Sequence, residues 1–289
     1  MDVRQLPVNI GYLNHAGIAL SAEERTCLQA GFDACRFKEG FHTLKFWGII
    51  HGINAKYYIV QGLQEDPLKP RITLYSKDYA HWARLPSVTD EMRRKTRHVR
   101  GRFTGDPSFD FEYCYRKPNF KANDEDEHGN DVLTERTSLK EEERLAATVE
   151  LINHEVEVMP RGYLRKSAKD EVKPNPMWQG LSLEEALLRS NYYHANPKRM
   201  RKLTAMVPPR NVPAIDFLES IEDAHSKPWW LVRGYRGSTV VTLRSLLWEG
   251  YTFFMVPDSR TFGSFYSGYG ERNLDVVHML PCPVAIDAE

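Results

Sequence analysis

The sequence predicts an α+β protein with an antiparallel or mixed β-sheet core and several amphipathic helices. Two groups of apolar, strand-like runs occupy residues 44–115 and 229–270, and most segments with helical periodicity lie between them. Because strands and helices come in separate blocks and do not alternate, the order disfavours a doubly wound parallel sheet. We expect one domain over residues 1–289.

The first helix is predicted over about residues 22–38. Ser21 and Glu24 form a capping box, in which the hydroxyl and the carboxylate each accept a hydrogen bond from a backbone N–H at the start of the helix. Behind this box, Leu28, Phe32 and Cys35 repeat at helical spacing.

Three further helices are expected in the middle of the chain. Ser138 begins a second capping box, and the apolar residues behind it recur at steps of four, three and four. Ser182 opens a third helix that runs toward Tyr192, and Pro213 suggests a shorter fourth helix. The apolar stripe behind Ser138 consists of Leu145, Val149, Ile152 and Val156.

The strands fall into two groups. The first contains LKFWGIIHGI, KYYIVQGL and ITLYS, and then an alternation of aromatic and polar residues from Phe109 to Tyr115 that predicts a strand with one buried face. The second contains WWLVRGYRG, STVVTLRSLLW, YTFFMV and FGSFYSGYG, which predicts a meander with a turn at Gly250. The pattern leaves open whether the two groups form one sheet or two.

Two segments are expected to lie outside the folded core. Residues 123–131 contain five acids and no Lys or Arg. A run this hydrophilic cannot bury enough area to fold, so we expect a mobile acidic loop over about residues 116–137. Residues 281–289 are expected to form a C-terminal tail.

Composition and charge exclude several classes of protein. Lys plus Arg and Asp plus Glu number 39 each, so the formal net charge is zero, and broad attraction to nucleic acid or to an anionic membrane is not expected. The longest apolar runs fall well short of the roughly 18 residues of a membrane-spanning helix. Sparse cysteines without CxxC spacing favour reduced thiols in a cytoplasmic protein. They are Cys27, Cys35, Cys114 and Cys282.

Motifs for catalysis, metals and cofactors are absent from the sequence. There is no GxxxxGK[ST], GxSxG or HExxH. Asp110 and Glu112 would project from one strand face about 6.5–7 Å apart, which suits a carboxylate pair, but a solvated face is the simpler interpretation. His278 and Cys282 are a dyad in principle, yet Pro281 lies between them in a tail. We therefore expect no enzyme activity, no cofactor and no metal.

A basic stretch, RRKTRHVRGR, runs from residue 93 to 102 with six Lys or Arg and no acid. One interpretation is a partner surface, and an alternative function follows from it: a peripheral binding module for an acidic partner, such as the microtubule surface or RNA. The simpler interpretation is that these side chains face the chain's own acids or water. The interface candidates here are Arg93, Arg94, Lys95 and Arg97.

Trp229 and Trp230 are also candidates for a partner interface. Neighbouring residues of a strand face opposite sides, so the two rings cannot both enter one core if both lie on a strand. One of them then needs cover from another helix of this chain or from a partner protein, since large exposed rings are uncommon. Tryptophan is also enriched at interface hot spots.

Long strings along most of the chain resemble the radial spoke head protein 9 family. In order, these strings are FWGIIHGINAKYYIVQGL from Phe46, PRITLYS, GRFTGDPSFDFEY from Gly101, WQGLSLEEA from Trp178, VTLRSLLWEGYTFFMVP from Val241, and TFGSFYSGYGERNLDVVHML. Matching residues within them are better interpreted as determinants of the fold than as a site. They include Phe46, Trp47, Gly48, Tyr57, Tyr58, Arg244, Leu246, Leu247 and Trp248.

The resemblance implies a non-enzymatic, structural subunit of the radial spoke head in the axoneme of motile cilia and flagella. The spoke extends from the outer doublet microtubules to the central pair apparatus and helps to regulate dynein-driven bending. The family is similar to spoke head proteins 4 and 6, and it is expected to pack against them; no membrane and no nucleic acid is expected as a partner. The acidic loop near Asp124 and the tail after Leu280 depart from the family pattern and receive no family function.

Overall fold

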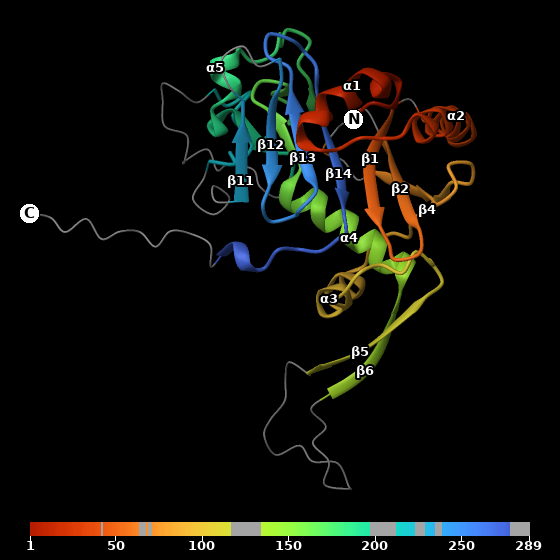
Figure 1. Cartoon of the computed structure of the whole chain (residues 1–289). Coiled ribbons are helices and arrows are strands. Elements are labelled where there is room, and N and C mark those ends of the chain that lie inside the picture. The colour runs from red at the N-terminus through yellow and green to blue at the C-terminus, as the bar shows by residue number, and fades with distance from the viewer. Residues whose placement is uncertain are drawn as a thin grey trace, which may run out of the picture.

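A mixed eight-stranded sheet forms the centre of the molecule (Figure 1). The computed structural model describes residues 1–41, 43–63, 68, 71–116, 134–196, 212–222, 229–234 and 239–277. In spatial order the strands of the sheet are β11 (Trp230–Arg233), β12 (Val241–Ser245), β13 (Tyr251–Met255), β14 (Phe262–Gly268), β1 (Thr43–His51), β2 (Lys56–Leu63), β3 (Ile72–Ser76) and β4 (Ala83–Arg84).

Both predicted strand groups contribute to this one sheet, which confirms the α+β class. Within this sheet, the strands of each group pair antiparallel with one another, and β1 joins the groups by pairing parallel with β14. Gly48 makes this junction possible. Its φ is 154°, and a Cβ at this position would lie 2.1 Å from the carbonyl oxygen of Tyr266. A side chain at residue 48 would therefore push the two halves of the sheet apart.

Two N-terminal helices cover one face of the sheet, α1 (Leu6–Leu13) and α2 (Ala22–Glu39) (Figure 1). The helix predicted over residues 22–38 is confirmed together with its capping box: the Ser21 hydroxyl accepts from the Glu24 N–H, and the Ser21 N–H donates to the Glu24 carboxylate, both at 3.0 Å. Helix α1 was not predicted from the sequence. It packs Leu6, Ile10 and Leu13 into the cluster between these helices and the sheet.

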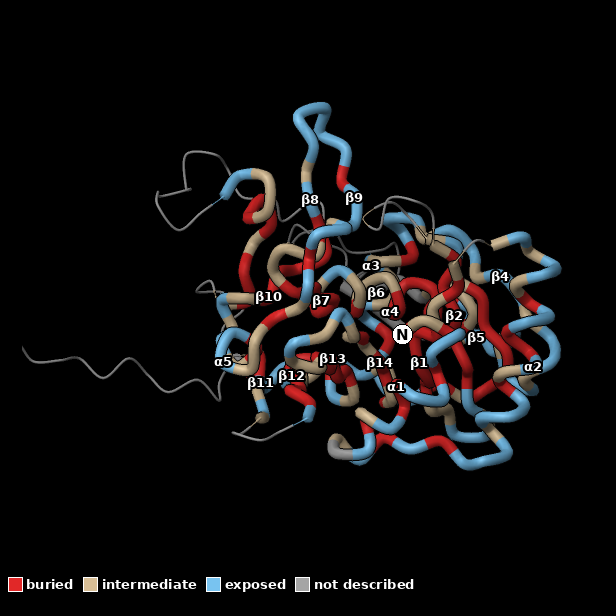
Figure 2. The backbone as a smooth tube through the Cα atoms, turned by 90° about the horizontal axis from the view of Figure 1, so that it is seen from above, coloured by how far each residue is buried: buried red, intermediate tan, exposed pale blue. Residues whose placement is uncertain are grey.

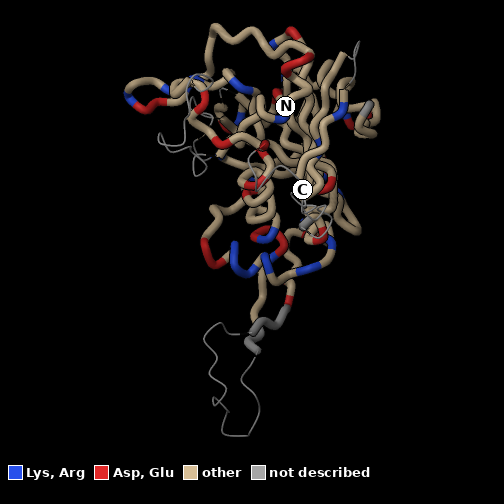
Figure 3. Tube along the Cα trace, turned by 90° about the vertical axis from the view of Figure 1, so that its left-hand side faces the viewer, with Lys and Arg blue, Asp and Glu red and all other residues tan. Residues whose placement is uncertain are grey.

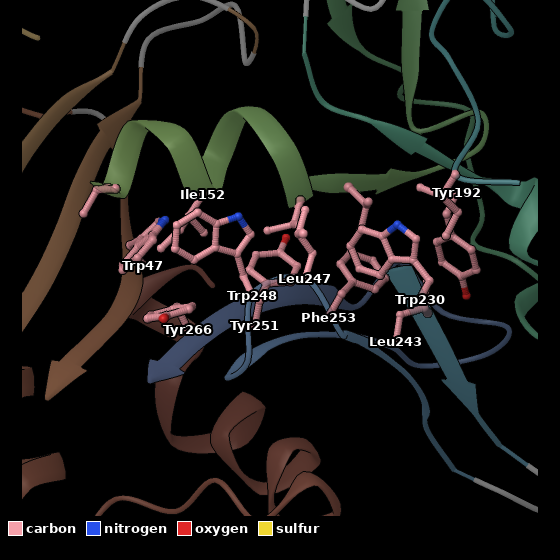
Figure 4. Packing of buried hydrophobic residues seen from close by; sticks show 14 of the residues in the cluster. Trp47, Ile152, Tyr192, Trp230, Leu243, Leu247, Trp248, Tyr251, Phe253 and Tyr266 are labelled. Atoms are coloured by element: carbon pink, nitrogen blue, oxygen red, sulfur yellow. The ribbon is translucent and has the colours of Figure 1, made fainter. Parts of the chain in front are cut away.

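The opposite face is covered by α4 (Glu141–Val156), whose apolar stripe enters a second cluster of aromatic and aliphatic side chains. Figure 4 shows Trp47, Trp248, Tyr251, Tyr266 and neighbouring side chains filling the space between this helix and the strands. The predicted start of the helix is wrong, because Ser138 lies in the preceding strand. The N-cap residue is Lys140, whose backbone N–H donates to the Glu143 carboxylate at 3.3 Å.

Residues 158–196 and 212–222 add a small module beside α4, called here the 158–222 module. It contains β7 (Val158–Pro160) paired with β10 (Tyr192–His194), β8 (Leu164–Lys166) paired with β9 (Val172–Pro174), and α5 (Leu183–Ala186). The β8–β9 pair extends from the body with mostly exposed residues (Figure 2).

Both helix predictions for residues 182–222 need correction. The helix that opens at Ser182 ends after one turn, because the chain around Tyr192 forms a strand with β7. No helix follows Pro213 within the described residues 212–222. There the Asp216 carboxylate accepts from the Val212 N–H at 2.7 Å, and this local bond stabilises a turn in place of a helix.

One end of the molecule carries α3 (Asp90–His98) and a hairpin of β5 (Asp110–Arg116) and β6 (Thr134–Lys140) that projects away from the sheet (Figure 1). The strand expected around residues 109–115 is confirmed, but Phe109 is 43% exposed, so its ring is not on a buried face. Of the acidic loop predicted over residues 116–137, residue 116 belongs to β5 and residues 134–137 belong to β6. The rest of that loop, residues 117–133, and the tail 281–289 lie outside the described residues.

No helix among the described residues combines the length and the apolar composition needed to cross a membrane.

Candidate functional site

Helix α3 contains much of the basic stretch. The Thr89 hydroxyl accepts from the Met92 N–H at 3.2 Å and caps the helix. Its first turn is acidic and its last turn basic, which complements the helix dipole. Met92 is the only residue of the helix that is buried, and the other residues of α3 are half-buried or exposed. The helix therefore presents charges at the end of the molecule from which the hairpin projects (Figure 3).

Two of the four basic interface candidates are held by acids of this chain. Arg93 pairs with Asp90 and with Glu150, whose Oε1 lies 2.8 Å from the guanidinium. The hydrogen bond to Glu150 raises the pKa of Arg93. Lys95 Nζ lies 2.9 Å from Glu91 Oε1, one helical turn away.

The other two candidates have weaker contacts within the chain. Arg94 is exposed, and its Nε donates to the backbone oxygen of Asp90 at 3.4 Å. Arg97 is also exposed and lines a groove beside the helix.

This groove has a volume of about 590 Å³ and lies between α3, α4 and the segment after β14. The residues that α4 contributes to the groove recur at steps of four, three and four along the helix. They lie next to the apolar stripe that faces the sheet. The lining residues are Thr96, Arg97, Val99, Arg100, Gly101, Arg144, Thr148, Leu151, Glu155, Trp248, Gly270, Glu271, Arg272 and Leu274.

Arg144 is a buried cation in the wall of the groove. Its side chain is 3% exposed, and its Cζ lies 4.3 Å from the centroid of the Phe103 ring and 4.7 Å from that of Phe111. One terminal nitrogen donates to the Gly101 carbonyl, whereas Nη1 has no hydrogen-bond partner in the described structure. Burial lowers the pKa of Arg144 to about 10, so the guanidinium still carries its charge at neutral pH.

Glu155 fixes the opposite wall of the groove. Its Oε2 accepts from Trp248 Nε1 at 2.7 Å and from Arg272 Nε at 2.9 Å. Two donors from distant parts of the chain thus converge on one carboxylate, which ties the segment after β14 to α4.

A buried carboxylate at the start of α4 holds the loop between α3 and β5 to the sheet at this end. Glu141 accepts from Tyr57 Oη at 2.6 Å, from the N–H and hydroxyl of Thr104 at 2.8 and 2.7 Å, and from the Gly105 N–H at 2.7 Å. Four donors satisfy both carboxylate oxygens, as a buried anion requires. Burial, followed by the hydrogen bond to this carboxylate, raises the pKa of Tyr57, so its hydroxyl remains a donor.

The two adjacent tryptophans do not project to opposite sides of the sheet. Trp230 begins β11, is 3% exposed and lies within the cluster under α4, close to Tyr192 and Leu243 (Figure 4). Trp229 precedes the strand and packs, half-buried, against the same cluster. The expectation that the two rings face opposite sides required both residues to lie on a strand, and Trp229 lies before it. Side chains of this chain cover most of both rings. Their role in a partner interface remains a prediction.

The weaker catalytic candidates lie apart from the groove lining. Asp110 and Glu112 are exposed on β5. His278 and Cys282 fall outside the described residues. In the part of the chain that the structure describes, no group of three or more His, Cys, Asp or Glu side chains is placed to hold a metal ion.

The basic stretch identified one wall of the groove, whereas Arg144 and Arg272 were missed. The α4 wall could have been predicted from a second set of residues at helical spacing, beside the apolar stripe. These residues are Arg144, Thr148, Leu151 and Glu155. No local pattern predicts that residues 270–274 lie against it.

Comparisons with known proteins give relatives along nearly the whole chain. Residues 1–67 match the model of a family described as radial spokehead-like protein. The chain is 38% identical over 283 residues to the radial spoke head protein 9 homolog of Bos taurus, which covers 97% of this chain and 100% of the relative. The homologs of the same name from Homo sapiens and Danio rerio are 36% and 37% identical, with the same coverage of both chains.

Proposed function

The chain belongs to the radial spoke head protein 9 family, and from this premise we propose that it is a scaffold of the spoke head without catalytic activity of its own. It is a structural subunit of the radial spoke head in the axoneme of cilia and flagella, as the sequence resemblance predicted. The observation that carries this conclusion is the collinear match over 97% of the chain.

The lack of catalytic activity is the part of this proposal that goes beyond family membership. The groove is lined by arginines, apolar side chains, two threonines and two glutamates, of which Glu155 already accepts from Trp248 and Arg272, and it presents no Ser, Cys or His as a nucleophile or base. The buried carboxylates Glu141 and Asp216 accept hydrogen bonds that fix the backbone. These features support a role in holding shape.

We further propose that the chain packs against spoke head proteins 4 and 6, and that through them it acts between the spoke stalk and the central pair apparatus to help regulate dynein-driven motility. The contacts would use the accessible part of the candidate residues, namely Arg94 and Arg97 on α3 and the exposed part of Trp229. Arg93, Lys95 and Trp230 contribute less, because side chains of this chain already hold them.

Detergent extraction of axonemes tests the scaffold role. In a flagellated cell that lacks its own copy, the reintroduced chain should stay with the extracted axoneme and should restore the spoke head in electron micrographs. Finding all of it in the detergent-soluble fraction, with spoke heads still missing, would contradict the proposal.

A separate variant tests the absence of catalysis. Asp110→Asn combined with Glu112→Gln keeps the shape of both exposed side chains and removes their acid–base chemistry. Beating should be restored to the level of the unmodified chain, as measured by beat frequency and waveform. A motility defect in cells whose spoke heads are fully assembled would point to chemistry at this pair.

A further inference from the structure

We propose that the groove between α3, α4 and residues 270–274 binds an acidic segment of a neighbouring protein chain, and that Arg97 and Arg100 receive a carboxylate of that segment. The inference deepens the proposed scaffold function by naming one docking surface and the chemistry of its partner. It rests on that function only for the source of the segment, a neighbouring spoke head subunit.

The charges of the groove favour an anion. Its lining contains four arginines and two glutamates. Glu155 already accepts from Trp248 and Arg272. Arg97 and Arg100 are exposed, and neither has an ion-pair partner among the described residues. The groove therefore presents two guanidinium groups whose geometry matches a carboxylate.

A second, independent observation comes from the wall of the groove. Arg144 is 3% exposed, and its Nη1 has no hydrogen-bond partner in the described structure. A buried donor without a partner costs free energy, typically about 1–3 kcal/mol, and natural structures seldom leave one of this kind. The charge of Arg144, held by Phe103 and Phe111, adds to the positive potential of the groove whether or not a ligand touches it.

The surroundings favour a polypeptide over a simple ion. Val99 and Leu151 line the groove, and Leu274 at its edge is 50% exposed. Tyr269, close by in the sequence, is 45% exposed and lies under Arg102, whose Cζ is 4.0 Å from the ring centroid. Arginine and aromatic residues beside exposed apolar groups are typical of the centre of a protein–protein interface.

Nucleic acid is the less favoured partner. The net charge of zero supplies no broad attraction to a long chain of phosphates. A volume of about 590 Å³ suits a few side chains of a peptide and not a duplex.

Fluorescence anisotropy on the full chain tests the proposal. The probe is a short labelled peptide in which glutamate and leucine alternate, and the comparison peptide has glutamine in place of glutamate. The unmodified chain should bind the acidic peptide, and binding should weaken as salt rises. Arg97→Gln combined with Arg100→Gln should reduce the affinity about tenfold or more, because both partners of the carboxylate are lost.

The matched control is Arg25→Gln combined with Lys38→Gln, which makes the same change in net charge on exposed positions of α2. This control should bind like the unmodified chain, and all variants should keep its melting temperature. Equal binding by the Arg97/Arg100 variant, equal loss in the α2 control, or equal binding of the glutamine peptide would overturn the proposal. Competition by inorganic phosphate at concentrations similar to the peptide would also overturn it, since the site would then bind simple anions.

A third variant separates the neighbouring chain from this chain's own acids. Replacing Asp124, Glu125, Asp126 and Glu127 by their amides should leave peptide binding unchanged. A large gain in affinity would mean that the internal acidic run occupies the groove, which contradicts a partner chain. Because these assays use the isolated protein, they can fail while the chain still assembles into spoke heads, and they can succeed if it does not.

Discussion

The sheet body and the α3 end of the molecule are stabilised in different ways. The body consists of the eight-stranded sheet with apolar clusters on both faces, and its largest side chains are almost fully buried. The α3 end comprises α3, the base of the β5–β6 hairpin and residues 269–274, and it is rich in charges and exposed rings. Burial dominates the body, whereas ion pairs and hydrogen bonds arrange the α3 end and leave arginines available.

This difference suggests that the two regions of a scaffold subunit have different roles, one in maintaining shape and one in recognition. A body with a packed core holds its shape when force or partners act on it. The α3 end, with side chains that are positioned but still accessible, is suited to recognition. Glu141, the first residue of α4, connects the two regions. Its carboxylate accepts hydrogen bonds from the sheet residue Tyr57 and from the loop residues Thr104 and Gly105.

The largest effect is expected in the body, at Phe253. Its ring is buried and lies 5.6 Å from the ring of Tyr192 and 5.8 Å from that of Phe262, between centroids. Phe253→Ala should lower the free energy of unfolding by about 3–5 kcal/mol, because it leaves a cavity in the cluster. Urea unfolding followed by circular dichroism measures the change.

The matched control is Phe37→Ala on α2, where the side chain is 93% exposed. Its effect should stay within about 0.5 kcal/mol. If the two substitutions were equally destabilising, burial in the sheet cluster would not be the main source of stability in the body.

The next largest effect is expected at the connection between the regions. Glu141→Gln keeps the shape of the side chain but places an amide among four donors, so at least one buried hydrogen bond is lost, at a cost of about 3 kcal/mol. Hydrogen exchange should rise at Thr104, Gly105 and along β5, while the centre of the sheet stays protected. Glu142→Gln is the control with the smaller expected change, because Glu142 accepts one longer bond from Tyr75, at 3.3 Å, which the amide oxygen of glutamine can still accept. Uniform loosening of the whole sheet would contradict a local connecting role.

A smaller effect is expected at the buried ion pair of the 158–222 module. Asp216 accepts from Arg161 Nε at 2.8 Å and Nη2 at 2.9 Å, and from Tyr193 Oη at 2.6 Å. Because Arg161 is partly exposed and solvent screens its charge, Asp216→Asn should cost only about 2 kcal/mol at neutral pH.

The stability that Asp216 contributes should also depend on pH. Burial by itself raises the pKa of this carboxyl, but the hydrogen bonds from Arg161 and Tyr193 outweigh burial and hold the pKa below its usual value of 3.8. The unfolded chain therefore takes up this proton at a higher pH than the folded chain. The contribution is complete above the usual value and is lost as the pH falls through the lower folded value. Unfolding curves of the original chain and Asp216→Asn should converge in acid; a constant difference down to pH 2 would contradict the assignment.

The smallest effect is expected on α3 itself. Lys95→Gln removes the pair with Glu91, and both side chains reach solvent. Exposed pairs of this kind contribute little, so the melting temperature should stay within experimental error. Differential scanning calorimetry measures it. A shift as large as that of Asp216→Asn would show that α3 is part of the stabilising framework of the body, and the contrast between the two regions would disappear.

The regular part of the body was predictable because its strands are long apolar and β-branched runs, and α2 begins with a capping box. Helix α1 was not, since LPVNIGYL contains Pro7 and Gly11 and forms a helix through packing against the sheet. Helix α3 was missed because its side chains are almost all polar, so no apolar stripe marks it. The short α5 and the turn at residues 213–222 show tertiary pairing overriding local helical signals.

The candidate site was predictable only in part for a related reason. Arg97 and Arg100 are visible in the sequence as members of a basic run, but a groove requires its other walls. Arg144 and Arg272 are separated from them by long stretches of chain and come close only because α4 crosses the sheet and β14 returns beside β1. Such long-range placement leaves no local pattern in the sequence.

Hydrogen exchange with mass spectrometry, on the isolated chain and on the chain within assembled spoke heads, compares the two regions most directly. If the body supplies shape and the α3 end supplies contacts, assembly should slow exchange in peptides that cover residues 94–104 and 268–276, while peptides from β12, β13 and β14 remain unchanged. Unaltered exchange at the α3 end, together with new protection confined to α1 and α2, would contradict the account.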